Sequence, residues 1–340
     1  MLRVAILGAG EIARAHSDAY EALGAKAQVV AVAGREREKA EELAKRFGAE
    51  VYTDAKEALQ ADVDVVDVCL PTFLHEEFVI AAAQQGKHVF CEKPIALSVE
   101  AADRMVAAAK EAGVKFMVGQ CIRFWPEYVA CRQRLAQGDL GEIRTINAAR
   151  ISAAPNWSAG GWILQPELSG GAVVDLHIHD VDFADSLMPV PPQRVMAVGA
   201  RSRRGALDQV HTLIDYGPDR AACVEASWLV PEGYPFTMAL RIVCEHGTIE
   251  FTSRGIDVES RAESDNQVVV YKAGGEREVV PIPERKDAYL AEIEYFLDCV
   301  AGDVEPSLVT AEDARNSLAL VLAARRSALE GRAIDLTKEG

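Results

Sequence analysis

The chain has no long hydrophobic run, no excess of basic residues and no closely paired cysteines. A membrane-spanning helix needs about 18 or more consecutive apolar residues, so none is expected. The 36 basic residues are outnumbered by 52 acidic ones, which gives a net charge of −16. This balance argues against binding to nucleic acid or to an anionic membrane, because both need a basic face. A local basic pocket is still compatible with it.

The seven cysteines are an odd number, are scattered along the chain and include no C-x-x-C pair. This pattern is typical of reduced, mostly buried thiols, and small core residues are a simpler role for them than catalysis. The first expected strand begins at residue 2, which leaves no room for a signal peptide. Together these features predict a cytoplasmic protein.

The most informative motif lies at the start of the chain. An apolar run over residues 4–7 leads into the sequence GAGEIA at residues 8–13, which fits the pattern G-x-G-x-x-G/A, and an amphipathic helical pattern follows. In such a turn Gly8 permits the tight bend, Gly10 lets the backbone approach a pyrophosphate, and Ala13 allows close packing of the helix on the sheet. The N–H groups at the helix start favour an anion. This context predicts a dinucleotide site.

The periodicity changes along the chain. Up to about residue 120, short apolar runs alternate with helical patterns, which indicates parallel strands covered by helices on both faces. From about residue 142, strands that alternate polar and apolar residues indicate an antiparallel sheet with one covered face, and two helices end the chain. We therefore predict an α/β protein with a Rossmann-type, doubly wound parallel sheet in residues 1–122. Residues 123–340 are predicted to form an α+β domain with a large, mostly antiparallel, open sheet.

Two further stretches carry candidate chemistry. The fifth expected strand runs into Glu92-Lys93-Pro94, which places Lys93 at the carboxyl end of a parallel strand, where open α/β sheets bind ligands. The proline fixes a turn and is compatible with a cis peptide bond. Later, Asp175 and His179 are spaced i and i+4, so on a helix they share one face.

A metal site is the alternative for the later stretch. His177, His179 and Asp182 are all able to bind a cation, and Asp182 falls on the face of His179 if the segment is one helix. His177 points elsewhere on that helix, so the three groups do not share one face. We therefore expect no metal.

These motifs, in this order, resemble those of the Gfo/Idh/MocA family, named after glucose–fructose oxidoreductase and inositol dehydrogenase. The matching features are the glycine turn, PTFLH at residues 71–75, EKP at residues 92–94 and the segment from Gly170 to His179. The resemblance implies that Lys93, Asp175 and His179 surround the reacting carbon of a sugar or cyclitol beside a nicotinamide. It implies an NAD(P)-dependent oxidoreductase that transfers a hydride between nicotinamide and a secondary alcohol or ketone.

The residue types fit this chemistry. Oxidation of a secondary alcohol releases a hydride and a proton, and the ordinary pKa of histidine, near neutrality, suits His179 to the proton step. Lys93 could donate a hydrogen bond to the substrate oxygen or take its proton. Asp175 could orient the histidine or bind a neighbouring hydroxyl. A surface lysine and a core histidine are the simpler alternatives.

The resemblance also implies a set of cofactor contacts: Gly8, Gly10, Glu11, Ile12, Gly34, Arg35, Leu70, Pro71, Thr72, His75, Glu92 and Lys93. NAD-binding domains usually carry an acidic residue at the end of the second strand, where this chain has Gly34 and Arg35. No carboxylate would repel a 2′-phosphate there, and Arg35 could pair with it. NADP is therefore favoured and NAD is possible. The alternative is that Arg35 stacks on adenine or lies in solvent while NAD binds.

The substrate is predicted only as a class, a small polyol or sugar. Candidate contacts are Arg123, Asn156, Trp157 and Trp162, because aromatic faces and amides suit a polyhydroxylated ring and an arginine suits an anionic group. Structural packing and a structural ion pair are the alternatives. The uncovered sheet face predicts a homodimer or homotetramer. Two other classes stay open: a glycosidase that uses NAD transiently, and a non-catalytic nicotinamide-sensing protein.

Overall fold

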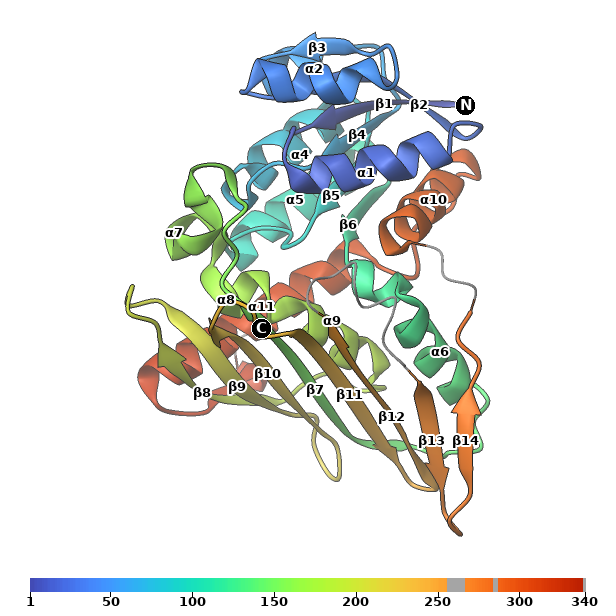
Figure 1. Ribbon diagram of the computed structural model, residues 1–340, viewed down its shortest axis with the longest axis vertical. Coiled ribbons are helices and arrows are strands. Elements are labelled where there is room, and N and C mark those ends of the chain that lie inside the picture. The colour runs from blue at the N-terminus through green and yellow to red at the C-terminus, as the bar shows by residue number, and fades with distance from the viewer. Residues whose placement is uncertain (256–266, 284–286, 339–340) are drawn as a thin grey trace. The chain divides into compact units, whose positions relative to one another are not determined.

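The computed structural model describes residues 1–255, 267–283 and 287–338 (Figure 1). Its contacts divide the chain into two compact units. Unit 1 contains Met1–Phe124, Trp157–Ile163 and the segment that ends at Leu318, and unit 2 contains the rest. The first change of unit therefore falls two residues after the boundary expected at residue 122. The later return of the chain to unit 1 gives no signal in the sequence.

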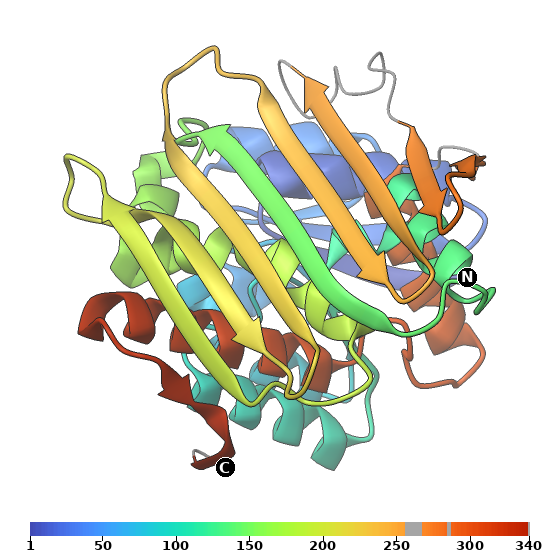
Figure 2. The same ribbon diagram turned by 90° about the horizontal axis from the view of Figure 1, so that it is seen from below.

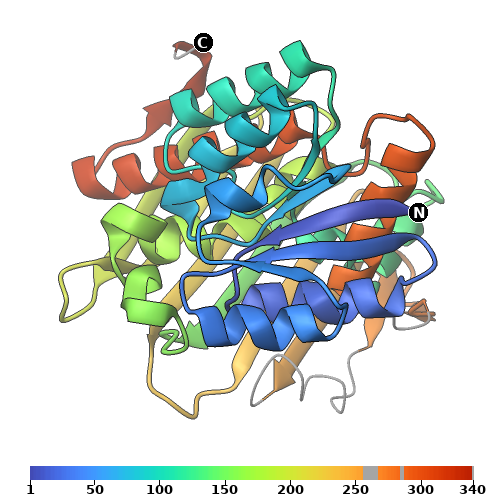
Figure 3. The ribbon, with the colours of Figure 1, turned by 90° about the horizontal axis from the view of Figure 1, so that it is seen from above.

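Unit 1 contains a six-stranded parallel sheet in the order β3-β2-β1-β4-β5-β6, as expected for a doubly wound fold. Its main elements are β1 (Leu2–Leu7), α1 (Glu11–Ala22), β2 (Ala27–Ala33), α2 (Arg37–Lys45), β3 (Glu50–Tyr52), α3 (Ala55–Ala58), β4 (Val65–Val68), α4 (His75–Gln84), β5 (His88–Glu92), α5 (Val99–Ala112), β6 (Phe116–Gly119) and α10 (Ala288–Ala301). Figure 3 shows α1 and α2 on one face of the sheet and α4 and α5 on the other.

The central strands are apolar because helices cover both of their faces. Val4, Ala5, Ile6 and Leu7 of β1 are all fully buried, as the continuous apolar run predicts. Strands β2 and β3 lie on one side of β1, whereas β4, β5 and β6 lie on the other side, so the strand order changes direction between β1 and β4. The carboxyl ends of these two parallel strands meet at one edge of the sheet. This edge is where ligands of open α/β sheets bind.

Unit 2 contains a nine-stranded sheet in the order β14-β13-β12-β11-β7-β10-β9-β8-β15. Its elements are α6 (Pro126–Leu135), β7 (Ile143–Ala153), α7 (Pro166–Ser169), α8 (Gly171–Asp175), α9 (Ile178–Leu187), β8 (Arg194–Arg201), β9 (Leu207–Asp215), β10 (Ala221–Val230), β11 (Phe236–Cys244), β12 (Gly247–Gly255), β13 (Val268–Lys272), β14 (Arg277–Val280) and β15 (Ile334–Asp335), while α11 (Ala311–Glu330) runs from unit 1 into unit 2. The pairing of β7 with β10 is parallel, and the other strand pairings in the described part of this sheet are antiparallel.

One face of this sheet is covered and the other is open. Figure 2 shows the strands in front, with α8 and α9 behind them. Along β9, Val210, Thr212 and Ile214 are buried under these helices, whereas Leu213 on the opposite face is 50% exposed. The predicted fold class is therefore confirmed for both domains.

The structure also shows the state of the cysteines and the length of the apolar helices. All seven cysteines are free thiols in the described part of the chain, and six of them are buried. Among the described residues, no helix is both long and apolar enough to cross a bilayer.

Candidate active site

The glycine turn after β1 has the geometry of a dinucleotide cradle. Gly8 has a φ of 126°, and a Cβ there would lie 2.3 Å from the carbonyl oxygen of Cys69, so only glycine fits. Gly10 is the exposed N-cap of α1, and a Cβ there would meet no atom within 4 Å. The cap makes no side-chain hydrogen bond, which leaves the helix start to an external anion. The residues present therefore fit the pyrophosphate of a dinucleotide.

The two glycines should respond differently to substitution. Gly8→Ala should lower the free energy of unfolding by about 3 kcal/mol, through strain and overpacking against the β4 end. Gly10→Val should change that free energy by less than about 1 kcal/mol, since the space is open and a glycine cap contributes little, yet it should abolish dinucleotide binding. Urea unfolding and calorimetric titration with NAD and NADP measure the two effects. Unchanged cofactor affinity in Gly10→Val would contradict the cradle.

The end of β2 places Gly34 against the glycine turn. A Cβ at this position would lie 2.7 Å from Cβ of Ala9 and 3.2 Å from Cβ of Ala40. Close packing therefore requires glycine here, independently of cofactor choice. The next residue, Arg35, has an exposed side chain at the cofactor edge of the sheet.

The segment after β4 contributes Leu70, Pro71, Thr72 and His75. Nδ1 and Nε2 of His75 each lie 2.8 Å from a backbone carbonyl oxygen, that of Pro94 and that of Leu70 respectively. The ring is buried, and burial lowers its pKa. His75 thus braces the segment after β4 against the turn after β5. It supports the cofactor edge, and the half-buried Leu70 and Pro71 lie nearer to solvent.

Lys93 follows directly after β5, as predicted, and is half-buried. The peptide bond between Lys93 and Pro94 is cis. The preceding side chain, Glu92, is buried and accepts a hydrogen bond from the backbone N–H of Lys93 at 3.0 Å. The lysine therefore stands at the same edge of the sheet as the glycine turn, on a backbone fixed by its neighbour.

Asp175 and His179 do not share a single helix, so that part of the prediction is wrong. Asp175 is the last residue of α8, and His179 is the second residue of α9. Between them the N–H of His177 bonds the carbonyl of Ala172, five residues back, which inserts an extra residue into the helical path. Asp175 is buried and His179 is half-buried.

A buried ion pair fixes the position of α9. Asp180, next to His179, accepts a hydrogen bond of 2.7 Å from Nε of Arg150 on β7. A second guanidinium nitrogen of Arg150 lies 3.1 Å from the hydroxyl of Tyr128 on α6, and the guanidinium stacks on Trp125 at 5.4 Å. These contacts join three elements of unit 2, namely α6, β7 and α9, at the residue that follows His179. Trp125 is thus part of the packing of this unit.

His177 is fully buried and lies against the sheet of unit 2. Its Nε2 is 2.9 Å from Oγ1 of Thr212 on β9, and burial lowers the pKa of its imidazole to about 3. His177 therefore points away from any solvent-facing site, in agreement with the expectation that it does not share the face of His179. This contact makes it a structural residue of the core.

Acid should destabilise the protein through His177. In the unfolded chain the imidazole has the ordinary histidine pKa of 6.5, whereas in the folded protein its pKa is about 3. The unfolded state therefore binds more protons between these values, and stability falls by about 1.4 kcal/mol per pH unit as the pH drops through this window. Denaturant unfolding of His177→Gln should show a shallower pH dependence than the parent protein. The control is His246→Gln at an exposed position, which should keep the pH dependence of the parent protein.

The predicted substrate residues are in different environments. Arg123 is 5% exposed, lies 3.1 Å from Oδ2 of Asp313 and donates to the carbonyl of Leu308, which favours its structural alternative. Asn156 and Trp157 are exposed, and Trp162 is half-buried. The two tryptophans belong to the short segment of unit 1 that interrupts unit 2.

A set of buried polar side chains in unit 1 was not predicted from the sequence. His16 is common to two groups whose ligand-type atoms lie within 4.8 Å of one another, one with Asp67 and Cys69 and the other with Glu92 and Glu292. All five side chains are buried. We name these five residues the His16 cluster. The only sequence signal is Asp67, a carboxylate inside the apolar strand β4.

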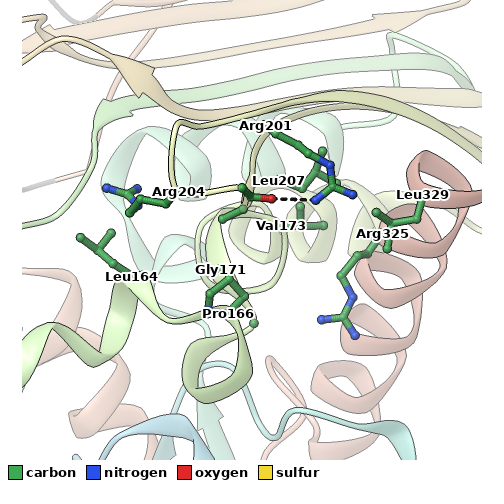
Figure 4. Close-up of a pocket in the computed structure, with 12 residues that line it drawn as sticks. Leu164, Pro166, Gly171, Val173, Arg201, Arg204, Leu207, Arg325 and Leu329 are labelled. Atoms are coloured by element: carbon green, nitrogen blue, oxygen red, sulfur yellow. Dashed lines mark hydrogen bonds between the residues drawn. The ribbon is translucent and has the colours of Figure 1, made fainter.

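Unit 2 contains a pocket of about 330 Å³, whose lining residues are drawn in Figure 4. Arg201, Arg204 and Arg325 line it together with Gly171, and the guanidinium of Arg201 donates to the carbonyl of Gly205. Burial lowers the pKa of Arg325, although a guanidinium stays cationic at neutral pH. This positive pocket differs in chemistry from the predicted polyol site, whose expected residues do not line it.

Comparison with known proteins agrees with this geometry. Residues 2–120 match the model of an oxidoreductase family with an NAD-binding Rossmann fold, GFO_IDH_MocA, and residues 128–250 match the GFO/IDH/MocA C-terminal domain. Inositol 2-dehydrogenase of Rhizobium meliloti (strain 1021) is 32% identical over 352 residues, which cover 98% of this chain and 99% of that protein. The chain belongs to the Gfo/Idh/MocA family of oxidoreductases.

Two further relatives cover nearly the whole chain. The scyllo-inositol 2-dehydrogenase (NAD(+)) of Bacillus subtilis (strain 168) is 28% identical, across 98% of this chain and 96% of that protein. Levoglucosan dehydrogenase in complex with NADH is 25% identical and superimposes with a TM-score of 0.86, across 98% of this chain and 99% of that chain. The protein is therefore an NAD(P)-dependent dehydrogenase or reductase.

Proposed function

We propose that this protein oxidises a secondary hydroxyl of a cyclitol or ring-form sugar, with Lys93, Asp175 and His179 as its proton-handling residues. The main observation behind this proposal is the position of Lys93. It is half-buried at the carboxyl end of β5, on the same edge of the sheet as the open glycine turn at Gly10. Relatives named for inositol and levoglucosan support the substrate class. The family resemblance supports the assignment of the three residues to one reaction.

The bound nicotinamide cofactor supplies the hydride acceptor. Lys93 donates a hydrogen bond to the reacting oxygen, which stabilises the negative charge that develops as its proton leaves. His179 accepts that proton, because histidine is the residue type best suited to proton transfer near neutral pH, and its side chain is half-buried rather than part of the core. Asp175 orients His179 or binds the neighbouring hydroxyl. The buried pair of Arg150 and Asp180 keeps α9 in place for this step.

Ring recognition is assigned to the segment between β7 and α7. Trp157 is 55% exposed, which leaves its ring face free to cover an apolar sugar face, and the exposed amide of Asn156 can bind a hydroxyl. The half-buried Trp162 is the second candidate ring face. Arg123 is left out of this set, because its guanidinium is already paired within unit 1.

The proposed cofactor preference is NADP. Arg35 is exposed directly after Gly34, and no side chain fits at position 34 to oppose a 2′-phosphate. The guanidinium could make a charge-assisted, bidentate contact with that phosphate. This proposal goes beyond the relatives above, of which one is named for NAD(+) and another is a complex with NADH.

The function is tested by a spectrophotometric screen. Purified protein is mixed with NAD or NADP and a panel of inositols, aldoses, anhydrosugars and nucleotide sugars, and reduced nicotinamide is followed by its absorbance. We expect reduction with at least one cyclitol or ring-form sugar. Cleavage of an aryl glycoside with no net reduced cofactor would instead support the transient-NAD glycosidase. Cofactor binding with no turnover of either kind would support a sensor.

The open face of the unit 2 sheet predicts an oligomer. Val198, Leu213 and Val279 are between 47% and 58% exposed on strands of this sheet, and a second copy would cover such a face. Light scattering at micromolar concentration should give two or four times the monomer mass of 36.8 kDa. A monomer mass would contradict this proposal.

A further inference from the structure

The His16 cluster is a charged network inside an apolar layer of unit 1. Nδ1 of His16 lies 2.9 Å from Oδ2 of Asp67, and Nε2 lies 3.2 Å from Oε1 of Glu92. The imidazole is fully buried, and its ring lies 5.6 Å from that of Phe90 and 5.7 Å from that of Tyr289, between centroids. The three charged side chains come from α1, β4 and β5, so the network joins three separate elements.

The protonated form of His16 satisfies this geometry. Both ring nitrogens of His16 face carboxylate oxygens, and only an imidazolium donates from both. Burial is the largest influence on the pKa of His16 and lowers it. The charge and hydrogen bond of Asp67, together with the contributions of Cys69, more than offset burial and raise the pKa well above its usual value. Burial also raises the pKa of the thiol of Cys69, which stays neutral and donates toward Oδ1 of Asp67.

The network ends at the predicted catalytic residue. One oxygen of Glu92 bonds His16, and the other accepts the backbone N–H of Lys93 at 3.0 Å. At its other end, His16 lies five residues after Glu11, the first residue of the helix that the glycine turn begins. The carboxylate of Glu92 is thus shared between the cofactor helix and the backbone of the lysine.

We propose that Asp67, His16 and Glu92 form a positioning chain that holds Lys93 in register with the cofactor-binding end of α1. The proposal rests on the catalytic role of Lys93 given above, and adds how its place relative to the cofactor is set. Such a chain has a cost, because buried ion pairs are often less stabilising than apolar residues of the same shape. Their benefit is a fixed geometry, and a misplacement of about 1 Å at a reacting group can lower the rate roughly 100-fold.

Glu292 on α10 belongs to the cluster but not to the chain. Burial, followed by the charge of Glu92, raises the pKa of its carboxyl group well above the usual value, which favours the neutral acid. Neither of its oxygens has a hydrogen-bond partner among the described residues. Glu292→Gln therefore exchanges one neutral group for another of the same shape, and it is the matched control.

Glu92→Gln and His16→Gln test the chain directly. An amide has one acceptor oxygen, so glutamine at position 92 cannot present an acceptor oxygen on both sides, toward His16 and toward Lys93. Glutamine at position 16 carries no positive charge and has only one donor nitrogen in place of the two that face Asp67 and Glu92. Each variant should lower kcat by about 10–100-fold, with KM and cofactor affinity changed less than about 3-fold. The double variant should be no worse than the poorer single variant, because the members act as a unit. Glu292→Gln should stay within about 2-fold of the parent kcat.

Two readouts separate this role from a purely structural one. In a Lys93→Met background, Glu92→Gln should cause no further loss of kcat, since the carboxylate acts through the lysine. Hydrogen exchange followed by mass spectrometry should show loss of amide protection at Lys93 in Glu92→Gln and His16→Gln, but not in Glu292→Gln. If Lys93→Met keeps the parent kcat, the proposed catalytic role fails, and the exchange result alone then decides the positioning.

Three results would overturn the proposal. The first is unchanged protection of the Lys93 amide in both chain variants. The second is a loss of cofactor affinity or of folding in these variants that accounts for all of the lost activity. The third is a stoichiometric divalent cation in the purified protein that disappears in Glu292→Gln, which would make the cluster a metal site.

Discussion

Replacement of Lys93 by Met should lower kcat by about 10²–10⁴-fold, the range for loss of a positioned proton-handling group. Lys93→Met keeps a chain of similar length and removes only the charged, hydrogen-bonding end. His179→Asn should cause a loss of the same order. The affinity for the cofactor should change little in either variant, because the glycine turn is untouched. Steady-state kinetics and calorimetric cofactor titration on the same samples check both statements.

The combination of the two substitutions is more informative than either alone. If Lys93 and His179 serve one proton transfer, the double variant should be little worse than the poorer single variant. His177 is the internal control, since its ring packs against Thr212 inside unit 2. His177→Gln should keep most of the parent kcat per folded molecule. Loss of activity in His177→Gln with His179→Asn unaffected would show that the roles of the two histidines are reversed.

Arg35→Ala should weaken NADP binding by about 1–3 kcal/mol, the range for a hydrogen bond between charged groups. The affinity for NAD should change little, because NAD lacks the 2′-phosphate. Arg37→Ala is a matched control: it removes a nearby exposed arginine whose guanidinium already pairs with Glu41 at 2.7 Å. Equal affinities of the parent protein for NADP and NAD would contradict the proposed preference.

The fold could be predicted largely from local patterns. Gly34 was expected at the end of the second strand, and in the structure it directly follows β2 (Ala27–Ala33). Buried parallel strands give continuous apolar runs, and a half-covered sheet gives alternation, so both sheets leave a direct signal. The parallel pairing of β7 with β10 left no signal in the sequence, because strand pairing depends on which strands meet and not on their composition.

The site was predictable where chemistry requires a special backbone. Gly8 cannot be replaced without a clash, and Lys93 lies where a strand end and a proline put it. The helix break between Asp175 and His179 was missed, because an i, i+4 spacing cannot reveal one inserted residue. An arginine suits both a binding site and a buried ion pair, so the sequence could not decide the role of Arg123. Its partner, Asp313, is 190 residues away in the chain and is identified only by the structure.

The His16 cluster shows the same limit. Glu92 and Glu292 are ordinary in their own segments, and only the packing of α1, β4, β5 and α10 brings the cluster together. One member did leave a trace, since Asp67 is a charged residue in the otherwise apolar strand VVDV. A buried carboxylate needs a partner, but the sequence does not identify His16 as that partner.

The most direct test of the account is a hydride-transfer measurement with isotope. The substrate found in the screen is deuterated at the carbon that bears the reactive hydroxyl, and the reduced cofactor is isolated and analysed by mass spectrometry. The account predicts one deuterium in each reduced nicotinamide, no cleavage of the substrate, and loss of this transfer in Lys93→Met. A turnover that breaks a glycosidic bond and returns the cofactor oxidised, or a reduced cofactor without deuterium, would contradict it.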